Sequence, residues 1–290
     1  MKAVEHASTV FTPGLLEGRT ALVTGGGTGL GRATAVELAR CGARVLIAGR
    51  REDVLEEALG LILERTGAEA ESISGDIRDR AGARQIIAAA IERTGRLDLL
   101  VNNAGGQFFS PAELIAPKGW RAVWRLNVEG MLNMSEAAVE LAMGSAGGGT
   151  ILNVTLSPHH GMPGMAHSGA ARATVEALTR ELARRWEPLG VVVTAVAAGH
   201  FNTEVMAKYP DSVRKGMHGA APLQRMGTVE EHAWLVAMLA SPVGSAFNGS
   251  TVTLDGGRDN WFGAWPPAGM EDESGEVPVE QRRAPGTMPH

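Results

Sequence analysis

Short apolar runs alternate with stretches of helical periodicity along most of this chain. The apolar runs predict seven strands, at residues 19–24, 43–48, 70–74, 97–101, 149–155, 190–197 and 250–254. The amphipathic stretches predict helices at residues 30–41, 51–65, 79–94, about 111–144, 164–187 and 228–240. Runs such as VLIA and VVVTAV are apolar at every position, as expected when helices cover both faces of a parallel sheet. The pattern therefore predicts an α/β fold, a doubly wound parallel sheet of about seven strands.

No interior linker or internal repeat interrupts this alternation, so we expect one domain. It should extend over residues 14–257, after an N-terminal arm of residues 1–13. Residues 258–290 then form a C-terminal extension. The last 20 residues are polar and contain proline, which favours a tail that is partly mobile or lies on a neighbouring subunit.

Composition excludes several classes of function. The net charge of -5 gives no footprint for nucleic acid, and no apolar run approaches the roughly 20 residues that span a bilayer. The N-terminus has no hydrophobic signal core, so a cytoplasmic protein without membrane contact is expected. The single cysteine, Cys41, is expected to be a packed residue. Adjacent histidines point apart and no third ligand has suitable spacing, so no metal site is expected.

A glycine-rich segment separates the first predicted strand from the first predicted helix. Residues 24–31 read TGGGTGLG. Glycine lets the backbone turn tightly and lets a pyrophosphate approach, and a helix start presents free N–H groups and a positive dipole end. The segment therefore predicts a dinucleotide site, with contacts from Thr24, Gly25, Gly27, Thr28, Gly29, Leu30 and Gly31.

Small or polar residues also follow the other predicted strands. Ligands of open α/β sheets bind beyond the carboxyl ends of the strands, so these residues should surround the same ligand. The candidate cofactor contacts are Arg50, Arg51, Asp76, Ile77, Asn103, Ala104, Gly105, Gly199 and Thr203. Their agreement with the glycine segment is more specific than the glycine motif alone.

With these motifs, the sequence resembles the short-chain dehydrogenase/reductase family over roughly residues 14–257. The segments TGGGTGLG, GDIRD, LDLLVNNAG, LNVEG and LDGG occur in the family's order and spacing. Within the family, GGQFFSPAELIAPKGW and HSGAARA resemble most the peroxisomal-type trans-2-enoyl-CoA reductase branch. The resemblance implies a single-domain Rossmann-type fold, a nicotinamide dinucleotide and a homotetramer or homodimer.

The second strand ends without the carboxylate that would hold an adenosine ribose and repel a 2′-phosphate. Arg50 and Arg51 stand there instead, which favours NADP(H) over NAD(H), unless both are solvated charges at the start of the next helix. Asp76 is expected to accept a hydrogen bond from the adenine amino group, although a turn-forming role is the alternative. By the resemblance, Thr203 would reach the pyrophosphate or the carboxamide.

The tyrosine and lysine that the family uses for catalysis are absent. Aligned on the following helix, Ser168 stands at the tyrosine position and Arg172 at the lysine position. The sole tyrosine, Tyr209, lies in the loop after the sixth predicted strand. Arg172 can still hold the nicotinamide ribose, but its high pKa excludes it as a proton donor.

The remaining catalytic candidates each have a structural alternative. Asn127 matches the family asparagine, but a helix-interior asparagine is the alternative. Ser168 is a candidate hydrogen-bond donor or a helix cap. His167 and His160 are candidate proton donors because histidine titrates near neutral pH, whereas a histidine satisfied by the backbone would have no such role.

The leading functional hypothesis is the NAD(P)H-dependent reduction of an activated C=C bond in an enoyl thioester. Hydride goes to the β-carbon, and hydrogen-bond donors stabilise the enolate oxygen, so no alkoxide needs a proton. By the resemblance, residues from 201 to about 228 cover the substrate, and their methionines suit an irregular apolar ligand. A carbonyl reductase or alcohol dehydrogenase with a non-standard acid is one alternative. A dinucleotide-binding protein that has lost catalysis is the other.

Overall fold

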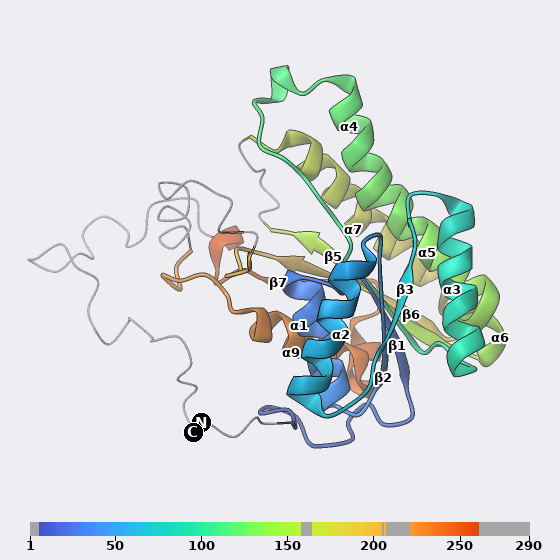
Figure 1. The fold of residues 1–290 in the computed structure, drawn as a ribbon. Coiled ribbons are helices and arrows are strands. Elements are labelled where there is room, and N and C mark those ends of the chain that lie inside the picture. The colour runs from blue at the N-terminus through green and yellow to red at the C-terminus, as the bar shows by residue number, and fades with distance from the viewer. Residues whose placement is uncertain (1–5, 158–163, 205, 207–220, 261–290) are drawn as a thin grey trace, which may run out of the picture.

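The computed structural model describes residues 6–157, 164–204, 206 and 221–260 of the chain. Within them, seven parallel strands form one sheet in the order β3-β2-β1-β4-β5-β6-β7 (Figure 1). The strands are β1 Thr20–Thr24, β2 Arg44–Gly49, β3 Glu71–Ser74, β4 Leu99–Asn102, β5 Gly149–Leu156, β6 Val191–Ala198 and β7 Thr251–Leu254. The predicted doubly wound sheet is confirmed.

The helices of the described residues cover both faces of the sheet. They are α1 Gly29–Arg40, α2 Glu52–Thr66, α3 Arg80–Thr94, α4 Pro117–Trp124, α5 Gly130–Ala138, α6 Gly144–Ala146, α7 Ala166–Trp186 and α9 Val229–Ala240. Figure 1 shows α1, α2 and α9 on one side of the sheet and α3, α5 and α7 on the other. None of the helices searched in the described part of the chain is long and apolar enough to cross a membrane.

Two hydrophobic cores explain why the strands are apolar at every position. Ala21 and Val23 of β1 pack with α1, α2 and α9, whereas Leu22 between them packs with α3, α5 and α7. Successive side chains of a strand point to opposite faces, so both sets of positions must be apolar. The sheet is therefore buried on both faces, and its strand ends are left to bind ligands.

The sheet order changes direction at β1, and this change locates the site. The chain runs outward from β1 through β2 to β3, then returns to β4 on the other side of β1. The loops after β1 and β4 consequently leave the sheet in opposite directions and open a crevice between them. The glycine-rich segment occupies this position.

The stretch predicted as one helix over about 111–144 is interrupted. A short 3-10 helix, Ala112–Leu114, precedes α4, and α4 joins α5 through a π-helical turn at Arg125–Glu129. Asn127 lies in this turn, and its Nδ2 donates to the Val123 carbonyl at 2.7 Å. The side chain thus takes the carbonyl that a regular helix would offer to a backbone N–H, which explains the wider turn.

Candidate cofactor and active site

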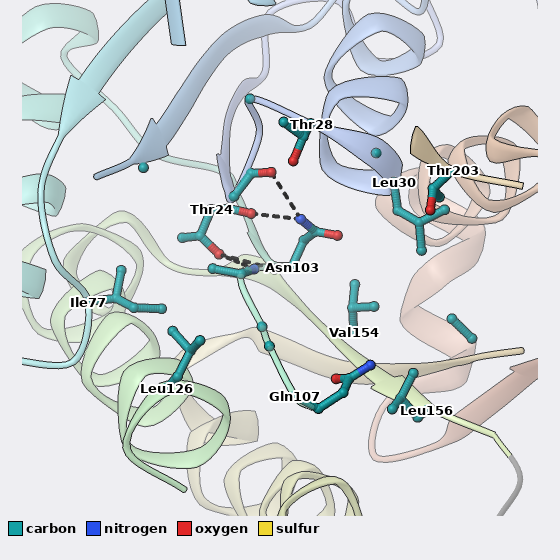
Figure 2. A pocket seen from close by; sticks show the side chains of 18 of the residues that line it. Thr24, Thr28, Leu30, Ile77, Asn103, Gln107, Leu126, Val154, Leu156 and Thr203 are labelled. Carbon is teal, nitrogen blue, oxygen red and sulfur yellow. Dashed lines mark hydrogen bonds between the residues drawn. The ribbon is translucent and has the colours of Figure 1, made fainter. Parts of the chain in front are cut away.

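A pocket of about 500 Å³ lies along the carboxyl ends of β1, β2, β4, β5 and β6. Most of the residues predicted to bind the dinucleotide line it, and Figure 2 shows several of their side chains. These are Thr24, Gly25, Gly27, Thr28, Gly29, Leu30, Arg50, Arg51, Asp76, Ile77, Asn103, Ala104, Gly105, Arg172, Gly199 and Thr203. The structure therefore brings residues from six separate chain segments to one pocket.

Gly31 is the predicted contact that does not line the pocket. It is buried in the first turn of α1, where an added Cβ would overlap the Asn103 side chain and the Gly25 carbonyl oxygen. Gly25 and Gly29 adopt positive φ angles of 65° and 53°, which disfavour other residues. Gly31 thus lets α1 pack against the loop, while the other glycines shape the surface that faces the ligand.

Thr24 and Asn103 join the loops after β1 and β4. The Thr24 hydroxyl accepts from the backbone N–H groups of Asn103 and Ala104, at 3.0 and 3.1 Å. The Asn103 Nδ2 donates back to the Thr24 and Gly25 carbonyls, at 3.0 and 3.3 Å (Figure 2). Both side chains are therefore committed to holding the crevice open, although both line the pocket.

The start of α1 offers hydrogen-bond donors to the pocket. Thr28 precedes the helix in an extended conformation, and its side chain makes no capping hydrogen bond. The first N–H groups of a helix have no partner within it, and the helix dipole makes this end positive. These N–H groups begin a helix of twelve residues, and such a helix start is suited to bind a pyrophosphate.

A cluster of arginines lies at the ends of β2 and β3. Arg50 and Arg51 line the pocket, and Arg78 holds the neighbouring Asp76 through its Nε, 2.9 Å from each carboxylate oxygen. Hydrogen bonds from the Arg78 side chain, helped by the charge of Arg50, lower the pKa of Asp76 to about 2. Asp76 is therefore ionised and already paired. Arg78 was missed by sequence reasoning, although it follows Asp76 by two residues.

Arg172 is a buried cation inside the pocket. Its Nη1 donates to the Val154 carbonyl at 2.7 Å, whereas its Nε has no hydrogen-bond partner. An added Cβ at Gly105 would overlap its Nη2, so glycine is required beside the guanidinium. Burial lowers the pKa of Arg172 to about 10, which leaves it charged at neutral pH. No carboxylate of the described residues forms a salt bridge with it, so the charge favours an anionic or hydroxyl-bearing ligand.

Asn127 acts on the pocket through the backbone. Its Oδ1 accepts from the Gly106 N–H at 3.2 Å, and its Nδ2 donates to the Gly106 carbonyl at 2.9 Å. The side chain is buried and does not itself line the pocket. Asn127 thus fixes the segment that carries Gly105 and Gly106 against Arg172.

His167 and Ser168 lie in the first turn of α7, behind the pocket lining. Both are 1% exposed, and neither the ring nitrogens nor the hydroxyl have a hydrogen-bond partner. The His167 ring packs on Phe108 at 4.3 Å between centroids, and burial lowers its pKa. Ser168 therefore makes no capping hydrogen bond in this turn, and the Met165 backbone opposes the larger effect of burial on the pKa of His167. His160 and Tyr209 lie outside the described residues.

Sequence reasoning did not single out two further polar side chains that line the pocket. Gln107 extends beside Val154 and Leu156 in Figure 2, and His200 follows β6 by two residues. Both stand in segments that the strand-end argument indicated. Their residue types alone gave no signal, because glutamine and histidine are common in loops.

Comparisons with known proteins place most of the chain in one family. The family model described as enoyl-(acyl carrier protein) reductase matches residues 25–259. The chain is 36% identical to a Bacillus subtilis protein named probable 2,4-dienoyl-CoA reductase, (2E)-enoyl-CoA-producing, over 87% of this chain and 100% of that protein. It is 34% identical to the peroxisomal 2,4-dienoyl-CoA reductase, (3E)-enoyl-CoA-producing, of Arabidopsis thaliana, over 85% of this chain and 86% of that one.

Solved structures agree with the fold. A citronellol catabolism dehydrogenase from Pseudomonas aeruginosa is 38% identical, with a TM-score of 0.77, over 86% of this chain and 98% of that chain. A gluconate 5-dehydrogenase from Burkholderia cenocepacia, in complex with NADP and tartrate, is 30% identical, with a TM-score of 0.79, over 85% and 97% of the two chains. The resemblance to the family is thereby confirmed, and the named relatives indicate a branch like the 2,4-dienoyl-CoA reductases.

Proposed function

Because the chain belongs to the short-chain dehydrogenase/reductase family of oxidoreductases, which use a nicotinamide dinucleotide, we propose that it reduces a conjugated enoyl or dienoyl thioester with NADPH. One observation carries the proposal. The buried cation Arg172, which has no salt bridge to a described carboxylate, stands at the lysine position and Ser168 at the tyrosine position, in a pocket whose described lining contains no tyrosine. Such a pocket suits a reaction that stabilises an enolate oxygen and protonates no alkoxide.

The residues present fit a dinucleotide. The start of α1 would hold the pyrophosphate, Arg172 the nicotinamide ribose, and Thr203 the carboxamide or pyrophosphate. Arg50 and Arg51 would hold a 2′-phosphate, as bidentate donors to an anion. The NADP-bound relative supports the choice of NADPH over NADH. When bound, the nicotinamide supplies a hydride to the substrate.

Electron flow in the substrate explains which protein groups matter. As hydride enters at the far end of the conjugated system, an electron pair moves onto the thioester oxygen. The resulting enolate collapses when a carbon accepts a proton. From a dienoyl thioester, protonation at the α-carbon leaves a 3-ene and protonation at the γ-carbon leaves a 2-ene. The chain must therefore place hydrogen-bond donors at the oxygen and a proton source at one of these carbons.

The proposal assigns the hydrogen-bond donors at the thioester oxygen and the proton source to separate residues. Asn127 would hold the Gly105–Gly106 backbone at the reacting end, and Ser168 and His167 would support the first turn of α7 beside it. His160 stays a candidate proton donor. If His160→Ala keeps full turnover with the true substrate, that assignment fails.

A second candidate function is the oxidation of an alcohol or the reduction of a carbonyl. The relative named citronellol catabolism dehydrogenase, at 38% identity, is the observation that favours it. This reaction would need an acid other than the usual tyrosine.

One panel of substrates separates the candidates. NADPH absorbance is followed with 2,4-hexadienoyl-CoA, 2-butenoyl-CoA, citronellal and a simple ketone. Oxidation of NADPH with the thioesters but not with the carbonyl compounds supports the proposal. Oxidation of NADPH only with citronellal or the ketone supports the second candidate. Tight binding of NADPH without oxidation across the panel would instead indicate a dinucleotide-binding protein without catalysis.

Other expectations belong to the same proposal. The domain would extend over residues 14–257, residues from 201 to about 228 would cover the substrate, and the protein would act in the cytoplasm as a homotetramer or homodimer. Exposed apolar side chains on and beside α4, namely Leu114, Trp120 and Trp124, support a contact between subunits. Sedimentation of the wild type and of Trp124→Glu tests the assembly.

A further inference from the structure

Four polar side chains meet beyond the ends of β5, β6 and β7, which are neighbours in the sheet. Ser157 follows β5 directly, His200 follows β6 by two residues, and Asp255 follows β7 directly. Arg258 begins the short 3-10 helix Arg258–Asn260. Of the four, only His200 lines the cofactor pocket.

Asp255 fixes the position of Arg258. Its Oδ2 accepts from the Ser157 hydroxyl and from the Asp259 N–H, the latter at 2.8 Å. Its Oδ1 accepts from the Gly257 N–H at 2.9 Å. These bonds fold the segment after β7 back toward the ends of the sheet, and they bring Arg258 to the ring of His200.

The contact between Arg258 and His200 determines the protonation state of the imidazole. The Arg258 Nη1 lies 2.6 Å from Nε2 and 2.9 Å from Nδ1 of His200. An Nη1 this close to both nitrogens lies over the ring, because the in-plane lone pairs of the two nitrogens point away from each other. The guanidinium is a permanent cation, so it disfavours a second proton on the ring, and the imidazole stays neutral with one N–H donor.

Electrostatics agrees with this geometry. Burial, followed by the charge of Arg258, lowers the pKa of His200 to about 4, while Asp255 acts in the opposite direction. Among the described residues, these are the charged side chains whose fields act on the ring. A second cation next to Arg258 is therefore disfavoured across the physiological pH range.

We propose that His200 is a catalytic hydrogen-bond donor to the thioester oxygen, and that Arg258 is the positioning residue that keeps its ring neutral. This inference rests on the proposed function. As hydride reaches the substrate, the electron pair moves onto the thioester oxygen, and the His200 N–H donates to that oxygen without transferring its proton. The proton that completes the product comes from solvent through a separate donor. A neutral imidazole serves this role because its remaining N–H cannot be lost at working pH.

The first test reads the ring directly and needs no substrate. ¹⁵N-histidine NMR of the full chain, with the His200 signal assigned by its loss in His200→Gln, reports tautomer and pKa. We expect a neutral ring from pH 8 to about pH 5 in the wild type, and in Arg258→Met a pKa that moves up toward about 6.5. Arg184→Ala, which removes an exposed arginine of α7, is the matched control and should leave the signal unchanged. A wild-type ring that titrates near 6.5, or one unaffected by Arg258→Met, overturns the pairing.

The second test measures turnover of 2,4-hexadienoyl-CoA with NADPH. His200→Ala should lower kcat about 100-fold with a KM within about threefold of the wild type, because the donor acts mainly in the transition state. His200→Gln retains an N–H donor and should recover about tenfold of that loss. In Arg258→Met, the ionisation of His200 should appear at a higher pH in the profile of kcat than in the wild type.

The outcomes separate this inference from the proposed function. Turnover by the wild type with unchanged kcat in His200→Ala overturns the donor role alone. A wild type that reduces no thioester contradicts the substrate assignment, and with it the donor role, while the NMR result still decides the Arg258–His200 pairing. Circular dichroism and NADPH titration of both His200 variants show whether either has failed to fold.

Discussion

The two halves of the pocket are lined by different kinds of groups. Around the loops after β1 and β4, glycines and backbone groups form the surface, and the Thr24 and Asn103 side chains hold those loops together. Beyond β5, β6 and β7, the lining is mostly apolar or small, and within it stand two buried or part-buried charged or titratable side chains, Arg172 and His200. Arg258, behind the lining, contacts the ring of His200. In the proposed function, the first half would recognise the cofactor by shape, whereas the chemistry would depend on the identity of residues in the second half.

This difference explains how the halves respond to substitution. A surface formed by backbone groups is blocked when a substitution adds a Cβ, and such a substitution impairs ligand binding and packing together. A charged side chain can be removed while the fold is kept, so binding or turnover is lost alone. The following predictions test the comparison in order of expected effect.

Gly31→Val should have the largest effect. The added side chain would overlap the Gly25 carbonyl and the Asn103 side chain, at a cost of about 3 kcal/mol of unfolding free energy, and NADPH binding should be lost with it. Urea unfolding and fluorescence titration measure the two quantities. Gly60→Ala is the matched control. Gly60 is exposed in α2 with open space around it, so this change should stabilise the protein by about 0.5–1 kcal/mol. Normal NADPH affinity in Gly31→Val would contradict the shape argument.

Arg172→Met should separate binding from stability. Removing a buried charge that forms no salt bridge with a described carboxylate should raise the free energy of unfolding of the dinucleotide-free protein by about 1 kcal/mol, because the hydrogen bond to the Val154 carbonyl compensates only part of the cost of burial. NADPH affinity should fall about 100-fold, since two or more charge-assisted hydrogen bonds are lost. Thermal unfolding with and without NADPH measures both. A destabilised variant that binds NADPH normally would show that Arg172 is structural.

Arg50→Glu should affect one dinucleotide only. Replacing the cation by a carboxylate should weaken NADPH binding about tenfold to 100-fold, because a charge-assisted contact with the 2′-phosphate becomes a repulsion. NADH lacks that phosphate and should be nearly unaffected. Titrations of both dinucleotides decide it, and Arg65→Glu, which changes charge on α2 away from the pocket lining, is the control. Equal affinity of the wild type for NADPH and NADH would contradict the preference.

The two buried histidines should have the smallest effect at neutral pH, because their contribution to stability changes only as the pH falls. Burial lowers the pKa of His232 in α9 to about 4, and that of His200 is lowered to a similar value. Both pKa values are depressed below the unfolded value of about 6.5, so the unfolded chain binds more protons between these limits. Stability should therefore be full above about pH 6.5 and fall as the pH drops toward 4.

Variants assign this loss of stability to the individual histidines. His232→Phe should remove the contribution of His232 to the pH dependence of stability. In the wild type, this ring lies between α1 and α9, 3.4 Å from the Thr34 hydroxyl and edge-on to Phe201. Arg258→Met should reduce the contribution of His200. Urea unfolding at several pH values measures both slopes. If the dependence of the free energy of unfolding on pH were unchanged in both variants, groups other than these two histidines would be responsible for it.

The fold and the first half of the pocket were predictable because local patterns encode them. Continuous apolar runs marked strands buried on both faces, and the strand ends then placed Arg50, Asp76 and Asn103 at one edge of the sheet. Arg172 was placed by its position on a helix that follows β5. Gly31 was assigned to the ligand because a motif shows that glycine is required, but it does not show which neighbouring group excludes a side chain. The structure shows that the requirement is packing against Asn103.

The Arg258–His200 contact of the second half could not be predicted because it depends on contacts between distant segments. His200 and Arg258 are 58 residues apart, and nothing local to either indicates the other. The π-helical turn at Arg125–Glu129 likewise arises from the bonds of Asn127 to Val123 and to Gly106, a loop contact across 21 residues. Periodicity alone gives one regular helix there.

The most direct test of the central claim follows the hydride. The protein is incubated with 2,4-hexadienoyl-CoA and NADPH deuterated at the transferred position, and the thioester product is examined by mass spectrometry and NMR. The account predicts loss of one C=C bond and one deuterium on a carbon of the acyl chain. An acyl chain without deuterium and with both C=C bonds intact, from protein shown to bind NADPH, would contradict it.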